Sequence, residues 1–130
     1  MTTELWCLVG LTLWTLPLLY VGPVGTMKLH GVGWGVGNRA DQVETPAWVK
    51  RAERAANNHK ENLPLFAIIV LVLHVTQKHD EVTVGASVVY VAARIAHSVL
   101  YWVGVEKLAL RTVFYYVAIG ALLLLVTRLA

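Results

Sequence analysis

The stretch that decides the fold is residues 51–77, RAERAANNHKENLPLFAIIVLVLHVTQ, in which a polar half runs directly into an apolar half. Intervals of three and four residues lie on one face of an α-helix. The polar half has four side chains at such intervals: Arg51, Arg54, Asn58 and Glu61. Ionisable groups where a helix meets a bilayer are costly unless they pair or face a wet cavity. We therefore expect this stripe to be part of a functional site.

Three further apolar runs have the length of a membrane span, and they cover residues 5–24, 82–105 and 108–127. The last two are each interrupted by a single charged residue, Arg94 and Arg111. The whole chain is 57% hydrophobic and only 15% charged, against about 25% charged in soluble domains. Since a span needs about 20 mostly apolar residues, the sequence predicts an all-α integral membrane four-helix bundle, with residues 1–130 as one domain.

The basic residues predict the orientation of the spans. Eight lysines and arginines lie in or beside the first and third connections, against only Lys78 and Arg128 on the opposite side. By the positive-inside rule these two connections are cytoplasmic, and both termini lie outside the cytoplasm. The first run has an acidic flank, Glu4, and no cleavage site follows it, so we do not expect it to be a signal peptide. The basic residues flank spans rather than forming a patch with aromatic residues, which argues against nucleic-acid binding.

Several local features are predicted between the runs. Thr45 and Pro46 resemble a helix N-cap and first helical residue, so the second long helix is expected over residues 46–77. Residues 31–37 have glycine at every second position, which favours a flexible linker over a helix. Tight turns are expected at residues 78–81 and 104–107.

The third and fourth apolar runs also carry polar side chains on one helix face: Arg94, His97, Ser98 and Tyr101 in one, and Arg111, Thr112 and Tyr115 in the other. Together with the stripe they can converge in one pocket near the cytoplasmic headgroups. Arg94 lies too deep to reach water easily, and Glu61 is its expected partner. The histidines lack consistent ligand spacing, so no metal site is expected.

Simpler interpretations account for single residues in this set. A lone Arg–Glu pair is more often structural than functional, and juxtamembrane basic residues commonly bind anionic lipid. Neither explains why three helices each place an arginine with hydrogen-bonding partners at one depth. That excess of positive charge indicates an anionic, partly peptide-like ligand.

Three motifs resemble the membrane-associated proteins in eicosanoid and glutathione metabolism, the MAPEG family, and especially its bacterial branch. They are RAANNHKENLPLF at 54–66, RIAHSVLY at 94–101 and RTVFY at 111–115. The resemblance covers the whole chain. It implies a homotrimer in a bacterial inner membrane, with glutathione bound between subunits on the cytoplasmic side.

The resemblance also implies roles for individual residues. Arg54, Asn58 and Glu61, with Arg51 on the same stripe, would hold the charged ends and amides of glutathione. The same cleft would be lined by Arg94, His97, Tyr101 and Tyr115. Arg111 would lie nearest the thiol with Thr112 beside it, because a nearby cation favours the thiolate. Two departures from the family pattern are Asn57, where some members have arginine, and Thr112, where some have serine.

Two functions follow as hypotheses. The first is a glutathione transferase or peroxidase acting on a lipophilic small molecule that arrives from the membrane lipids between the first and fourth spans. The alternative is a non-enzymatic trimer that binds an anionic lipid or lipid-like ligand in the same cationic cleft. A proton or ion pathway is a weaker third hypothesis, because only Arg94 lies deep in a span.

Overall fold

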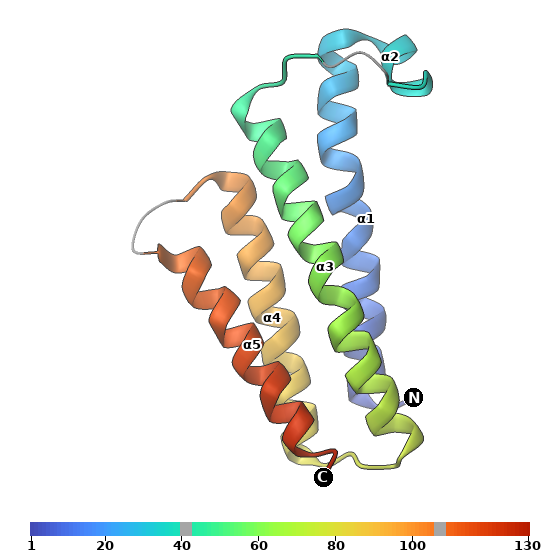
Figure 1. Cartoon of the computed structure of the whole chain (residues 1–130), viewed down its shortest axis with the longest axis vertical. Helices are drawn as coiled ribbons and strands as arrows, with labels where there is room; N and C mark the ends of the chain where they lie inside the picture. Colours follow the sequence, from blue (N-terminus) through green and yellow to red (C-terminus); the bar gives the residue numbers. More distant parts are fainter. Residues whose placement is uncertain (40–42, 106–108) are drawn as a thin grey trace.

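The computed structural model describes residues 1–39, 43–105 and 109–130 of the chain. These residues form five helices and no strand: α1 (Thr3–His30), α2 (Val32–Val36), α3 (Ala47–Val75), α4 (Glu81–Val103) and α5 (Leu110–Thr127). The four long helices run side by side, and both termini lie at the end of the molecule opposite α2 (Figure 1). At the α2 end, α1 and α3 reach beyond the hairpin of α4 and α5 (Figure 1). The turn predicted at 104–107 lies partly outside the described residues.

Three helices in the described part of the chain, α1, α4 and α5, are long and apolar enough to cross a membrane. The protein is therefore an integral membrane protein. The polar half of residues 51–77 lowers the mean hydropathy of α3, so α3 is not among these three. Large apolar side chains are exposed along the long helices, as expected of surfaces in contact with lipid. Examples are Leu13, Ile68, Val103, Tyr116 and Leu123.

A core of apolar side chains joins all four long helices. Leu11 of α1, Phe66 of α3 and Leu125 of α5 are each completely buried. The ring of Phe66 stacks on Tyr90 of α4, with 4.3 Å between ring centroids. The phenol of Tyr90 donates a hydrogen bond to the carbonyl oxygen of Asn62 at 3.1 Å. This core fixes α3 against α4 and thereby positions the polar residues one and two turns further toward α2.

The glycine-rich stretch at 31–37 is not the linker that its composition predicts, because residues 32–36 form the short helix α2. The side chain of Met27, near the end of α1, occupies the space where a Cβ on Gly35 would lie. Glycine at position 35 thus allows α2 to pack closely on the side chain of Met27. The predicted cap of α3 is also wrong: the helix begins at Ala47 after Pro46, without a side-chain cap from Thr45.

The turn predicted at residues 78–81 is confirmed, since α3 ends at Val75 and α4 begins at Glu81. Asp80 caps α4 in a capping box with Thr83 and forms an ion pair with Arg128. The backbone N–H of Thr83 holds the pKa of the Asp80 carboxyl below its ordinary value. These contacts attach the end of α5 to the turn between α3 and α4.

The separation of α2 from this turn makes the orientation testable. Cysteines introduced as Gly33→Cys and His79→Cys, in a Cys7→Ser background, are expected to react with a membrane-impermeant maleimide from opposite sides of sealed vesicles. A Cβ at Gly33 meets no other atom within 4 Å, so the substitution itself should be tolerated. The unsubstituted Cys7→Ser protein is the control. Labelling of both positions from one side would contradict the predicted topology, in which α3 also crosses the membrane.

Candidate functional site

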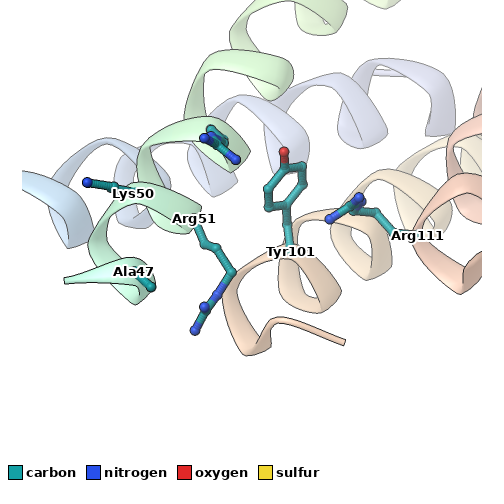
Figure 2. A pocket seen from close by; sticks show the side chains of 6 residues that line it. Ala47, Lys50, Arg51, Tyr101 and Arg111 are labelled. Atoms are coloured by element: carbon teal, nitrogen blue, oxygen red, sulfur yellow. The ribbon is translucent and has the colours of Figure 1, made fainter. Parts of the chain in front are cut away.

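A cleft of about 370 Å³ opens where the start of α3, the end of α4 and the start of α5 meet. Its lining residues are Ala47, Lys50, Arg51, Arg54, Tyr101 and Arg111 (Figure 2). Four of these six are cationic at neutral pH, and none is a carboxylate. The low-dielectric surroundings of a membrane helix bundle strengthen the attraction of such a cluster for an anion.

Each side of the cleft comes from a different helix. On α3, Lys50 and Arg54 are four residues apart and therefore neighbours on one face. On α5, the guanidinium of Arg111 lies over the ring of Tyr101 on α4, with 4.4 Å from its Cζ atom to the ring centroid (Figure 2). This cation–π contact orients the guanidinium without neutralising its charge. Arg111 thus remains able to bind an anion in the cleft.

A series of rings leads from the cleft into the protein interior. The centroid of His97 is 5.8 Å from that of Tyr101 and 6.0 Å from that of Tyr115. His97 is buried, and its Nδ1 atom has no partner within the described structure. The contacts between these rings connect Arg111 and Tyr101 with the buried polar residues of α4.

Arg94 lies on α4, one turn before His97, and is 1% exposed. Its Nη2 atom donates to the side-chain oxygen of Asn58 at 2.8 Å and to the carbonyl oxygen of Asn58 at 3.2 Å. Its Nη1 atom is buried without a partner in the described residues. Arg94 is therefore an under-satisfied cation held by neutral oxygens.

The predicted ion pair between Glu61 and Arg94 is wrong. Glu61 is exposed, and the ion pair found among the described residues is instead that of Arg128 with Asp80. Asn58 supplies two acceptor oxygens to Arg94 without the cost of burying a second charge. Asn58 lies on the predicted stripe, but the predicted partner of Arg94 is Glu61, one turn away.

The ten predicted site residues divide into two groups: four line the cleft, and six do not. Four are brought together in the cleft lining: Arg51, Arg54, Tyr101 and Arg111. Thr112 and Glu61 are exposed and do not line it, whereas Tyr115 is half-buried against His97. Lys50 lines the cleft although it was not among the predicted site residues. The feature of the sequence that indicates Lys50 as a cleft residue is its position four residues before Arg54, on the same helix face.

The described residues contain no group of three or more histidine, cysteine, aspartate or glutamate side chains that could hold a metal ion. They do contain a partly buried contact that the sequence did not predict, between the hydroxyl of Thr15 and Nε2 of His59 at 3.0 Å. It joins α1 to α3 next to Asn58, so α1 helps to fix the depth of the Asn58–Arg94 contact.

Comparison with known proteins gives one match. The model of the MAPEG family matches residues 5–130, nearly the whole chain. No curated protein and no solved structure matches the sequence at a significant level.

Proposed function

The chain belongs to the MAPEG family, and we propose that it is a membrane-bound glutathione transferase or peroxidase acting on lipophilic electrophiles. The observation that carries the proposal is the cleft of four cationic side chains beside Tyr101. Glutathione has two carboxylates, which arginine binds well in bidentate geometry. It also has a thiol, whose reactive form is an anion.

The proposed roles follow the geometry of the cleft. Arg51 and Arg54, with Lys50, bind the carboxylates from α3. Arg111 stabilises the thiolate from α5, where its contact with Tyr101 holds the guanidinium in place. The two functions are thus carried by different helices on opposite sides of one cavity.

Some side chains that do not line the cleft lie deeper in the helix bundle. Asn58 orients Arg94, which does not itself line the cavity. Asn57 is uncharged, so the positive charge that some family members place there is absent from this chain. Lys50 supplies a positive charge about two turns away.

We further propose that residues 1–130 form one unit with four membrane crossings, α3 being the fourth, and that the protein is a homotrimer. Glu61 and Thr112 are exposed in the single chain. A neighbouring subunit would bring them into a shared site, with Glu61 available for the amino group of glutathione and Thr112 for its thiol. The cleft would face the cytoplasm of a bacterial cell, at the inner membrane. The lipophilic substrate would reach it from the membrane lipids.

A titration of the detergent-purified protein with glutathione tests the proposal. Arg54→Leu is expected to raise the dissociation constant about 10- to 100-fold, the effect of losing one hydrogen bond to a charged group. The control is Arg39→Leu, which removes an equal charge from a residue that donates to the carbonyl of Gly35 outside the cleft. Equal effects of the two substitutions would contradict a role of Arg54 in binding.

The same titration separates the second hypothesis, an anionic lipid in the cleft. An enzyme of the proposed kind lowers the pKa of the bound thiol, which appears as thiolate absorbance in the ultraviolet. A lipid-binding protein shows no such absorbance, and its cleft is occupied by lipid that copurifies and is lost in Arg54→Leu. Absence of glutathione binding at millimolar concentration would favour the lipid.

A further inference from the structure

The end of α4 has an unusual relation to the cleft. The helix finishes at Gly104, whose φ of +76° lies in the left-handed region. The N–H groups of Gly104 and Val105 both donate to the carbonyl oxygen of Leu100 at 3.1 Å. Glycine is favoured at this position because a side chain is strained in such a backbone conformation.

Arg51 lies directly against this glycine. Its Nε atom donates to the carbonyl oxygen of Trp102 at 3.4 Å, and Figure 2 shows the side chain extending from α3 toward the end of α4. A Cβ added to Gly104 would lie 2.9 Å from Nε and 3.0 Å from Cζ of Arg51. The missing side chain therefore provides the space that the guanidinium occupies.

Electrostatics favour this arrangement. The last carbonyls of a helix carry partial negative charge, and a cation at this end is stabilised. A guanidinium has five N–H donors, and within the described residues only Nε of Arg51 makes a hydrogen bond to protein. Among the residues that the structure describes, its other donors have no acceptor, and the contact with Trp102 sets the direction of the side chain.

We propose that Gly104 is a positioning residue for Arg51: it lets the guanidinium lie across the end of α4 and so holds it, oriented, at the cleft. The consequence for glutathione rests on the proposed function above. A side chain that is fixed before binding loses less conformational freedom when the ligand arrives. Gly104 thus contributes to affinity without touching the ligand.

A double-mutant cycle tests this inference, with Gly104→Ala and Arg51→Gln alone and together. Gly104→Ala is expected to weaken glutathione binding about tenfold, as for loss of one charge-assisted contact. It is expected to have little effect in the Arg51→Gln background, where the side chain to be positioned is already absent. Gly31→Ala is the matched control, because Gly31 also has a positive φ, +88°, but a Cβ there meets no atom within 4 Å. It is expected to leave affinity unchanged.

The unfolding temperatures of the parent protein, the two single variants and the double variant separate this inference from the proposed function, since these measurements need no ligand. A smaller loss of stability from Gly104→Ala in the Arg51→Gln background supports the contact even if glutathione does not bind. Additive losses of stability would overturn it. If Gly104→Ala and Arg51→Gln are coupled in their effects on stability but additive in their effects on affinity, the positioning role is overturned. Gly104→Asn, which adopts left-handed backbone more readily, replaces Gly104→Ala if the alanine variant does not fold.

Discussion

Asn58→Ala is expected to destabilise the protein by about 3 kcal/mol, the upper range for leaving a buried polar group unsatisfied. The reason is that Arg94 is 1% exposed and receives a side-chain acceptor only from Asn58 among the described residues. The alanine variant keeps the carbonyl oxygen of residue 58 but leaves most of the guanidinium without a partner. The measurement is thermal unfolding of the purified protein in detergent.

Asn57→Ala is the matched control, because it changes the same residue type in the same turn of α3 at an exposed position. We expect it to alter stability by no more than about 0.5 kcal/mol, as for most surface substitutions. Equal unfolding temperatures of the two variants would contradict the assignment of Asn58 as the partner of Arg94.

Arg111→Leu is expected to raise the pKa of the bound glutathione thiol by about 1–3 pH units, because a cation close to the sulfur favours its ionised form. Below this raised pKa the thiol is protonated. Turnover should therefore fall, about tenfold for each pH unit by which the raised pKa exceeds the pH of the assay, and the pH–rate profile should move to higher pH. Affinity for glutathione should change less than turnover, since the carboxylate contacts on α3 remain.

Two further variants make this result specific. Arg111→Lys keeps the charge and should retain a lowered thiol pKa. Arg128→Leu removes an arginine at the other end of α5, where it pairs with Asp80, and should leave the pH–rate profile in place. The measurements are a pH titration of thiolate absorbance and steady-state kinetics with a model electrophile. An unchanged profile for Arg111→Leu would exclude Arg111 as the thiolate partner.

The long helices were predictable because a helix in contact with lipid needs a continuous apolar surface, which appears in the sequence as a long run of apolar residues. The apolar run at 5–24 lies within α1, Thr3–His30, which continues beyond it at both ends. A run of apolar residues marks the part of a helix that lies in lipid, whereas the helix itself continues into the headgroups. The short helix α2 was missed because Gly35 matters through its contact with the side chain of Met27, which the alternation of glycines at 31–37 does not show.

Spacing also predicted which residues share the cleft, but not how they pair. Helical intervals placed Arg51 and Arg54 on one face, and the structure has both in the cleft lining. The same intervals could not decide whether Asn58 or Glu61 meets Arg94, because both lie on that face. The choice depends on the rotation and depth of α3 against α4, which the packing of Phe66 on Tyr90 sets.

The unequal lengths of the helices tie the cleft to the thickness of the membrane. α5, with 18 residues, is about 27 Å long, whereas α1, with 28 residues, is about 42 Å long at 1.5 Å per residue. A hydrocarbon layer of about 30 Å is thus about as thick as α5 is long, whereas α1 is longer and extends beyond it. A thicker bilayer would bring acyl chains up to the cationic residues, and hydrophobic mismatch would have to be relieved by tilt or local thinning. For the proposed function, lipid composition thereby becomes a determinant of how easily water-soluble and lipid-soluble molecules meet in the cleft.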